Sequence, residues 1–320
     1  MRLMVTGASG FVGNAIVNRS IANSSWHLRA AARGRLAEVP DGVELVRVGD
    51  LAGDTDWRSA VAGVDAVVHA AARVHVMRDS AANPETEFRK ANVDGTINLA
   101  RQAVKAGVKR FVFISSIKVN GEYTLPGRPY TADDIPAPAD FYGISKKEAE
   151  LGLTQLAHET GLEVVIIRPV LVYGPGVKAN FRSMMHWLYR GIPLPLGALR
   201  NKRSFVSLDN LTDLVMACLS HPAAANQVFL ASDGEDLSTP ALLRRMAVAL
   251  GRPVRLFPIS PLILRGVARI ARRADFAQRL CCSLQVDIAK NKRVLGWAPP
   301  ASLDEGLKQT ARRFLADLSR

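Results

Sequence analysis

Three side chains in the middle of the chain have the types and spacing of a proton-transfer site. Tyr142 and Lys146 stand four residues apart in the stretch FYGISKKEAE, so in a helix they share one face. A phenol titrates at about 10 in water, and a nearby cation favours its ionised form, which allows proton exchange around neutral pH. Ser116, at the end of an apolar run, can hold the oxygen of a substrate. We therefore predict that Ser116, Tyr142 and Lys146 are catalytic.

A phosphate-binding turn is predicted near the beginning of the chain. The stretch VTGASGFVG follows an apolar run and precedes a helical pattern, which is the order strand, tight turn, helix. Glycine lets the main chain approach a pyrophosphate closely, and the following helix start offers free N–H groups and the positive end of its dipole. We assign this turn to a dinucleotide, with contacts from Gly7, Gly10, Phe11, Val12 and Gly13.

The charge further along the chain bears on which dinucleotide binds. About twenty residues beyond such glycines, an acidic residue suits the ribose 2′-hydroxyl of NAD, whereas an arginine suits the 2′-phosphate of NADP. Arg33 stands there with Arg35 beside it, and the next acidic residue is Glu38. The sequence therefore favours NADP(H) over NAD(H), unless both arginines are ordinary solvated surface residues.

These residues need elements that position them, and the hydrophobic pattern predicts such elements. Short apolar runs alternate with helical patterns, which are clearest over 85–106 and 142–160. This alternation predicts an α/β fold with a Rossmann-type doubly wound parallel sheet. After Pro169 turns become frequent and the elements shorten, which predicts a smaller C-terminal α/β substrate lobe. The expected division is a cofactor domain at 1–168 plus about 204–226, and a substrate lobe at 169–203 and 227–320.

Composition limits the other classes of function. The chain has a hydrophobic content of 48% and a formal net charge of +13, which suits a globular protein with an anionic ligand, a nucleic acid or a membrane surface as partner. No nucleic-acid-binding motif accompanies the charge, so we expect no such partner. The basic stretch 262–280 suits a helix on anionic lipid or, as we prefer, a lobe helix with one buried face.

The three cysteines and the absence of long apolar stretches add further expectations. The cysteines lack the paired spacing of a zinc site, so we expect neither a metal nor structural disulfides. No signal-like segment and no stretch long enough for a membrane span is found, which favours a cytoplasmic protein.

Taken together, these motifs resemble those of the extended short-chain dehydrogenase/reductase family, the group of nucleotide-sugar epimerases, dehydratases and reductases. The resemblance extends over nearly the whole chain. It implies that Tyr142 exchanges the proton of a sugar hydroxyl, that Lys146 also bonds the nicotinamide ribose, and that Ser116 completes a triad. Further residues would contact or support the cofactor, namely Asp50 and Leu51 at the adenine, Ala70, Ala71 and Ala72 at the nicotinamide ribose, and Asn92 as a structural residue beneath the site.

The resemblance also implies a nucleotide diphosphate in the smaller lobe. Asn180 and Arg203 match positions at which sugar epimerases hold the pyrophosphate, and the planar fork of an arginine suits phosphate oxygens. Arg73, His75 and Arg78 lie in a stretch similar to the family's sugar loop, where His75 is equally well explained as a packed loop residue. The implied partners are a UDP-sugar and a second copy of the chain, bound through the helices predicted at 85–106 and 142–160.

The two residues directly after Ser116 narrow the reaction. Dehydratases of this family carry an Asp-Glu pair there for water elimination, but this chain has Ile117 and Lys118, so we reject dehydration. The triad serves equally a 4-epimerase with retained NAD and a reductase of 4-keto sugars. Asn120 and Leu171 depart from the common epimerase pattern and resemble a bacterial subgroup that forms UDP-N-acetylquinovosamine for surface polysaccharide.

Three functions are therefore compatible with the sequence. The expected one is NAD(P)H-dependent reduction of a UDP-4-keto-6-deoxy-hexosamine at carbon 4. The alternative is 4-epimerisation of UDP-glucose or UDP-N-acetylglucosamine with NAD. A non-catalytic NADP sensor or a nucleic-acid-binding protein is the third.

Overall fold

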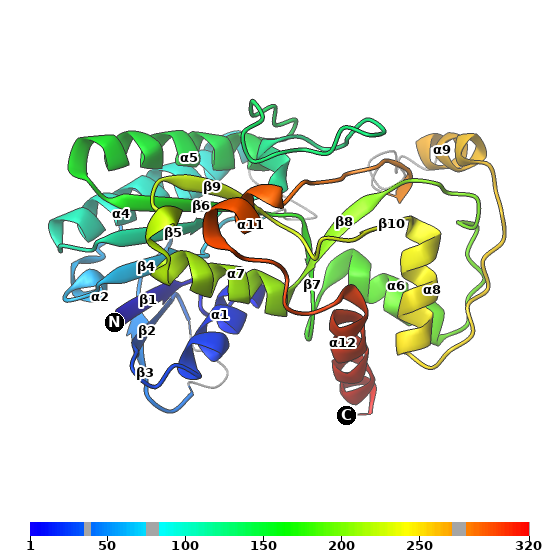
Figure 1. Ribbon diagram of the computed structural model, residues 1–320, viewed down its shortest axis with the longest axis horizontal. Coiled ribbons are helices and arrows are strands. Elements are labelled where there is room, and N and C mark those ends of the chain that lie inside the picture. The colour runs from blue at the N-terminus through cyan, green and yellow to red at the C-terminus, as the bar shows by residue number, and fades with distance from the viewer. Residues whose placement is uncertain (35–39, 75–82, 271–279, 320) are drawn as a thin grey trace.

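Two sheets organise the protein. The computed structural model describes residues 1–34, 40–74, 83–270 and 280–319 (Figure 1). The larger sheet has seven parallel strands in the order β3-β2-β1-β4-β5-β6-β9. These strands are β1 (Arg2–Thr6), β2 (His27–Ala32), β3 (Val43–Arg47), β4 (Ala66–His69), β5 (Arg110–Ile114), β6 (Glu163–Pro169) and β9 (Gln227–Ala231). The strand order reverses between β1 and β4, which is where such sheets bind their ligands, so the predicted Rossmann-type fold is confirmed.

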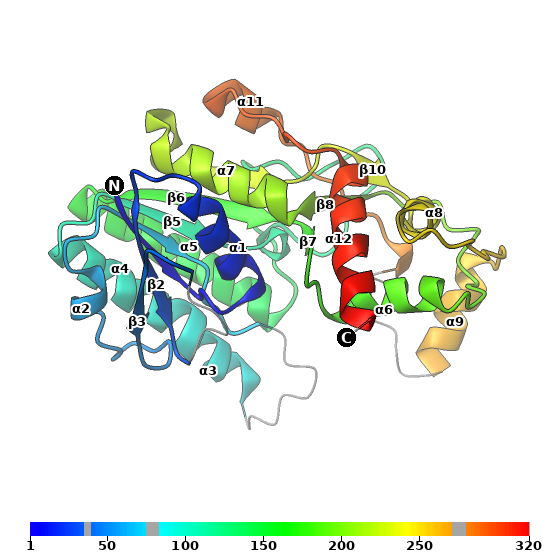
Figure 2. The ribbon, with the colours of Figure 1, turned by 90° about the horizontal axis from the view of Figure 1, so that it is seen from below.

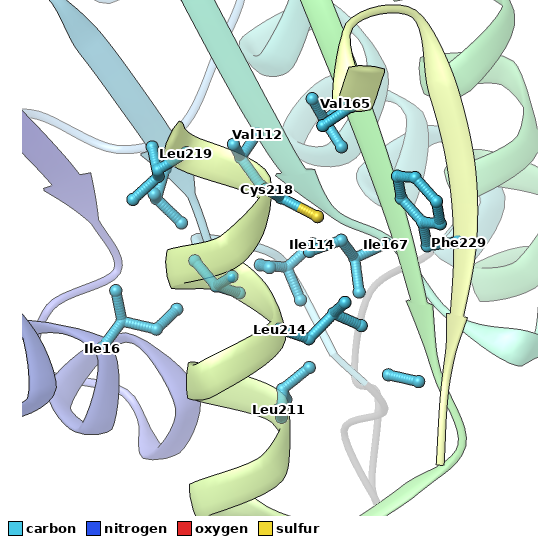
Figure 3. Close-up of a cluster of buried hydrophobic side chains, with 14 of the residues drawn as sticks. Ile16, Val112, Ile114, Val165, Ile167, Leu211, Leu214, Cys218, Leu219 and Phe229 are labelled. Atoms are coloured by element: carbon cyan, nitrogen blue, oxygen red, sulfur yellow. The ribbon is translucent and has the colours of Figure 1, made fainter. Parts of the chain in front are cut away.

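Helices cover both faces of the large sheet (Figures 1 and 2). One face carries α2 (Arg58–Val61), α4 (Gly95–Lys105) and α5 (Phe141–Thr160), and the other carries α1 (Phe11–Ile21), α7 (Leu208–Ser220) and α11 (Ala289–Leu295). Because successive strand residues point to opposite faces, Phe111 and Phe113 join the α4 and α5 side. Figure 3 shows the opposite side, where Leu214 and Cys218 of α7 pack near Ile114 and Ile167.

Helix α5 has well-defined ends, which matters because the predicted triad residues Tyr142 and Lys146 lie in its first two turns. Asp140 caps its N-terminus by accepting a hydrogen bond of 2.7 Å from the Gly143 amide. Gly161 ends it in the left-handed conformation, with φ of 74°. The boundaries predicted for this helix, 142–160, agree with the observed ones to within one residue.

The helix predicted at 85–106 is divided in the structure. It consists of α3 (Pro84–Arg89), a π-helical turn η1 (Lys90–Asp94) and α4. Hydrophobic periodicity did not indicate this turn, because the segments on both sides of it, α3 and α4, are themselves helical. Such turns are frequent at functional sites, and this one carries Asn92.

The smaller lobe surrounds a three-stranded sheet in the order β10-β8-β7. Its strands are β7 (Leu171–Tyr173), β8 (Arg203–Ser207) and β10 (Asp236–Leu237). Its core is formed mainly by α6 (Ala179–Tyr189), α8 (Thr239–Ala249) and α12 (Leu303–Leu318), and α9 (Pro261–Ile270) lies at its edge (Figure 1). Two short 3₁₀ turns, η2 (Ile117–Val119) and η3 (Pro222–Ala224), complete the described elements.

Two of the predicted domain boundaries differ from the observed sheets. The sequence placed 227–320 in the smaller lobe, but β9 pairs with β6 in the large sheet. It also placed residues from about 204 to 226 in the cofactor domain. Helix α7 of this segment does pack on the large sheet, but strand β8 belongs to the small sheet. The chain crosses between the lobes more often than its turn pattern indicates. Within the described ranges, no helix is long and apolar enough to cross a membrane.

Candidate active site

The turn between β1 and α1 has the shape of a cradle for a phosphate. Gly7 has φ of +67°, and a Cβ on it would lie 2.7 Å from the backbone nitrogen of Ala71. A Cβ on Gly13 would lie 2.2 Å from the carbonyl oxygen of Gly7. Helix α1 begins at Phe11 with Gly10 as its N-cap, so no side chain caps the first N–H groups, and its first turn has no acidic residue. These N–H groups suit an anion, so the turn fits a dinucleotide pyrophosphate.

The other predicted cofactor residues follow the carboxyl ends of neighbouring strands. Arg33 follows β2, and its guanidinium forms an ion pair of 2.9 Å with Asp50, which follows β3. Leu51 packs on the core beneath α4. The segment 70–72 follows β4 and meets the glycine turn at Ala71. Because the carboxyl ends of parallel strands share one edge, these residues lie along the same edge of the sheet as the turn.

The structure brings the three predicted catalytic residues together. Ser116 follows β5 and caps η2, accepting a hydrogen bond of 3.2 Å from the Lys118 amide. Ser116 lies close enough to the Tyr142 hydroxyl to lower its pKa, and both residues line one cavity. Lys146 is 2% exposed, and its Nζ donates to the carbonyl oxygen of Ile114 at 2.8 Å and lies 4.3 Å from the centre of the Phe113 ring.

Burial tunes both titrating groups of this triad. It raises the pKa of Tyr142 to about 12, which the hydrogen bond from Ser116 opposes and the charge of Asp140 reinforces. Burial also lowers the pKa of Lys146 to about 7, an effect that Glu150 opposes. At neutral pH the Tyr142 phenol is therefore uncharged, whereas Lys146 is close to the midpoint of its titration and keeps part of its positive charge. A positive charge beside them, such as that of an oxidised nicotinamide ring, favours the phenolate and makes Tyr142 a proton acceptor.

Asn92 holds the polypeptide next to the triad in place. Its side-chain oxygen accepts from the Arg73 amide at 2.8 Å, and its side-chain nitrogen lies 3.0 Å from the Arg73 carbonyl oxygen. The same nitrogen lies 3.0 Å from the hydroxyl of Ser145, which in turn donates to the Tyr142 carbonyl at 2.8 Å. Asn92 is thus connected to both the segment after β4 and the start of α5, as expected of a structural residue beneath the site.

A buried network behind the triad was missed by the sequence analysis. The Glu150 carboxylate accepts from the Ser115 hydroxyl at 2.5 Å and from Arg168 at 2.6 Å. Arg168 also donates to Asn120 at 3.0 Å, and all four side chains are buried. The signal was available, because an arginine inside the apolar strand pattern EVVIIRP needs a buried acidic partner.

His69 is a second buried group that the sequence did not single out. It ends β4, is fully buried, and its two ring nitrogens lie 2.6 Å from the Thr6 hydroxyl and 3.0 Å from the Thr96 hydroxyl. Burial, assisted by the charge of Lys146, lowers its pKa to about 3. It is therefore a neutral hydrogen-bonding residue of the core, not a proton carrier at neutral pH.

A cavity of about 320 Å³ joins the triad to the smaller lobe. Ser116 and Tyr142 line it from the large sheet, and Asn180, Arg203 and Phe205 line it from the small lobe. Arg203 also donates to the carbonyl oxygen of Cys282 at 3.1 Å. Two of the predicted catalytic residues, Ser116 and Tyr142, therefore face the same space as the predicted pyrophosphate residues, and the remaining wall is largely apolar.

The residues predicted for the sugar loop are only partly described. Arg73 is held through its backbone by Asn92, and its guanidinium lies 5.7 Å from the centre of the Phe88 ring. His75 and Arg78 lie outside the described residues. Among the described His, Cys, Asp and Glu residues, no group has the arrangement of a metal site.

Known proteins resemble this chain over its whole length. A family model described as "NAD dependent epimerase/dehydratase family" matches residues 3–231. A UDP-glucose 4-epimerase of Vibrio cholerae is 49% identical over 314 residues, which cover 98% of this chain and 95% of that protein.

Two solved structures have the same fold. The UDP-glucose 4-epimerase of Thermotoga maritima with UDP-glucose has a TM-score of 0.79 at 23% identity, covering 99% of this chain and 100% of its own. MoeE5 in complex with UDP-glucuronic acid and NAD has a TM-score of 0.79 at 26% identity, with the same coverage of both chains.

Proposed function

The chain belongs to the NAD-dependent epimerase/dehydratase family, and we propose that within this family it is a UDP-sugar 4-epimerase that retains its NAD. Membership confirms the predicted enzyme class, an NAD-dependent enzyme of nucleotide sugars. The finer proposal depends on one observation above all. A single cavity joins the hydroxyls of Ser116 and Tyr142 to Asn180 and Arg203, so the reacting carbon and the diphosphate of one ligand can be held together.

This proposal reverses the order of preference derived from the sequence. A reductase was expected first, partly because Asn120 replaces a tyrosine. In the structure Asn120 is buried and bonded to Arg168, so its identity is explained by the network behind the triad and does not indicate the reaction. Full-length similarity to a UDP-glucose 4-epimerase supports the alternative, and we adopt it.

The proposed mechanism uses the triad in both directions. Bound NAD supplies an acceptor, and later a donor, for the hydride at carbon 4 of the sugar. Ser116 holds the oxygen on that carbon, and Tyr142 takes its proton as the alcohol becomes a ketone. Lys146 favours the phenolate that this requires. The 4-keto sugar turns within the cavity and presents its other face for the return of the hydride to carbon 4, while Tyr142 gives the proton back to the oxygen on that carbon.

The apolar part of the cavity suits such a turn. Ile117, Val170 and Met184 are among its lining residues, and apolar groups offer few hydrogen bonds that would fix one orientation of the sugar. We propose that Asn180 and Arg203 hold the diphosphate meanwhile, with the guanidinium fork of Arg203 on the phosphate oxygens.

We propose NAD as the resident cofactor in place of the NADP(H) expected first. The expectation depended on Arg33 as an arginine available for a 2′-phosphate. Its guanidinium is instead paired with Asp50, and the carboxylate would repel a phosphate at this edge. The family's description as NAD-dependent supports the same choice. A homodimer through the helices predicted at 85–106 and 142–160, and a role in surface polysaccharide, stay predictions.

The proposal is tested with purified protein, NAD and either UDP-glucose or UDP-N-acetylglucosamine. We expect the corresponding galacto-isomer to form without net change in reduced nicotinamide. In a parallel reaction, UDP-4-keto-6-deoxy-N-acetylglucosamine is offered with NADPH or NADH. Stoichiometric loss of the reduced cofactor there, with no epimer in the first reactions, would replace the epimerase with the reductase.

A further inference from the structure

A charged cluster stands directly beside the proposed catalytic serine. The ammonium of Lys118 lies 3.0 Å from the Glu122 carboxylate and also pairs with the carboxylate of Asp140. The side chains of Lys118, Glu122 and Asp140 are 26%, 23% and 28% exposed, so water reaches the cluster only in part. We call these three residues the Lys118 cluster. Lys118 and Glu122 have no part in the proposed proton transfer or diphosphate contacts, and Asp140 acts on the triad only through its charge and its cap on α5.

The Lys118 cluster is fixed to the reacting residues by its own backbone. The Lys118 amide donates to the Ser116 hydroxyl at 3.2 Å, and Asp140 caps the helix that carries Tyr142. A Cβ on Gly143 would lie 2.8 Å from the Lys118 carbonyl oxygen, so η2 and the start of α5 are in close contact. The cluster therefore keeps a constant position relative to the two hydroxyls.

The same cluster forms part of the cavity wall. Lys118 and Glu122 line the cavity together with Ser116 and Tyr142. If the two hydroxyls hold the oxygen on carbon 4, as the proposed function requires, the nearest wall residues face the substituents of the carbons that flank carbon 4. Among the described lining residues, Lys118, Glu122 and Arg203 are those that carry charge, and Arg203 enters from the small lobe.

The charges of the Lys118 cluster favour some substituents over others. One ammonium faces two carboxylates, so the formal charges of the three side chains leave one net negative charge. A hydroxyl or an amide can accept from Lys118 and donate to Glu122 without disturbing the pairs. A ligand carboxylate would have to replace a protein carboxylate at Lys118 and remain close to it, which like charges oppose.

We propose that the Lys118 cluster is a specificity determinant that accepts UDP-sugars with uncharged groups next to carbon 4 and rejects UDP-uronates. This inference depends on the proposed function for the position of the sugar, but it concerns ligand choice and not turnover. In this proposal the carboxylates of Glu122 and Asp140 repel the carboxylate of a UDP-uronate. Lys118 donates a hydrogen bond to the uncharged group of an accepted sugar.

The test measures binding of UDP-glucose, UDP-glucuronate and UDP to the NAD-loaded protein by calorimetry. We expect the wild type to prefer UDP-glucose over UDP-glucuronate. Glu122→Gln removes one carboxylate and should reduce that preference about tenfold, equivalent to roughly 1.4 kcal/mol. Lys118→Gln leaves two carboxylates without their cation and should increase the preference. Binding of UDP should stay the same in both variants.

Glu148→Gln is the matched control. Glu148 is also a half-buried, ion-paired glutamate, 3.1 Å from Arg89, but it lies outside the cavity wall. Its substitution should leave the preference unchanged. A wild type that binds UDP-glucuronate as tightly as UDP-glucose overturns the inference. So does a Glu122→Gln variant that folds, binds UDP and has the same preference as the control.

The outcomes also separate this inference from the proposed function. A protein that prefers UDP-glucose, loses that preference on Glu122→Gln and yet forms no epimer contradicts the epimerase while supporting the cluster's role. A protein that epimerises both sugars equally well contradicts the cluster's role while supporting the epimerase.

Discussion

Tyr142 is the proton carrier of the proposed reaction, so removing its hydroxyl alone isolates that role. Tyr142→Phe keeps the ring beside Phe88, with centroids 6.2 Å apart, and leaves the glycine turn untouched. General acid–base catalysis contributes about 10²- to 10⁴-fold, and we expect kcat to fall by that factor. NAD affinity, measured by fluorescence titration, should change less than threefold, or about 0.7 kcal/mol. Turnover near the wild-type rate would remove Tyr142 from the mechanism.

Glu150 acts on catalysis through Lys146. The groups that act on the Lys146 ammonium are neutral His69 from β4, the Phe113 ring and the Ile114 carbonyl from β5, and Glu150 from α5. Since the Glu150 charge raises the pKa of Lys146, Glu150→Gln should let Lys146 lose its proton at lower pH. The alkaline limb of the kcat profile should then move down by about one pH unit.

One further variant makes the Glu150 experiment decisive. Glu150→Gln leaves Arg168 without its counter-charge, which commonly destabilises a protein by about 3–5 kcal/mol. The double variant Glu150→Gln/Arg168→Met removes both charges and keeps the test open if the single variant unfolds. A fall in rate by the same factor at every pH, with no movement of the limb, would show that the pair is only structural.

At the scale of elements, the π-helical turn η1 positions the site through one side chain. Asn92→Ala removes the partners of the Arg73 amide and carbonyl, and we expect the free energy of unfolding in urea to fall by about 1–3 kcal/mol. KM should rise because the segment after β4 loses its anchor to the helix.

Ser145→Ala is the control for this loss, because it removes the bond between Asn92 and α5 and keeps both bonds to Arg73. If Ser145→Ala raises KM as much as Asn92→Ala does, the anchoring of Arg73 is not the cause.

The same elements show what a sequence can predict. Strand and helix patterns predicted the fold, and the position of Tyr142 and Lys146 on one helix could be predicted because their spacing is local. The catalytic role of the triad stays a prediction. The network of Glu150, Arg168 and Asn120 joins three elements, and no local pattern records such a contact. The lobe boundary failed at β9 for the same reason, because strand pairing with β6 is decided by the tertiary fold and not by the turn pattern.

At the scale of the whole molecule, His69 links stability to pH. Folded His69 stays neutral down to a pKa of about 3, whereas in the unfolded chain it takes up a proton at about 6.5. Because folding lowers the pKa of His69, this residue stabilises the folded protein fully at a pH above its unfolded pKa of about 6.5. That contribution is lost as the pH falls towards the folded pKa of about 3. Between these values the free energy of unfolding should fall by about 1.4 kcal/mol per pH unit from this residue.

Urea unfolding at several pH values below about 6.5 measures this slope. His69→Asn keeps a polar group near Thr6 and Thr96 but has no proton to take up in this range. Its stability should therefore depend less steeply on pH than that of the wild type. Equal slopes would show that His69 does not control acid stability.

Two lobes with separate cores meet at one cavity, and this arrangement is what the epimerase proposal needs from the molecule as a whole. The large sheet contributes the cofactor edge and the triad, and the small lobe contributes Asn180 and Arg203. The hydride can leave carbon 4 and return to the same carbon only if the sugar stays between the two lobes throughout the reaction. The fate of the hydrogen on carbon 4 therefore reports on the whole proposal.

The most direct measurement traces UDP-glucose labelled with deuterium at carbon 4 through the reaction with NAD-loaded protein. We predict UDP-galactose that keeps the deuterium at carbon 4, with no net change in reduced nicotinamide and no exchange with solvent. Product that has lost the label, or no epimer together with consumption of NADPH or NADH by a 4-keto sugar, would contradict a retained-NAD epimerase.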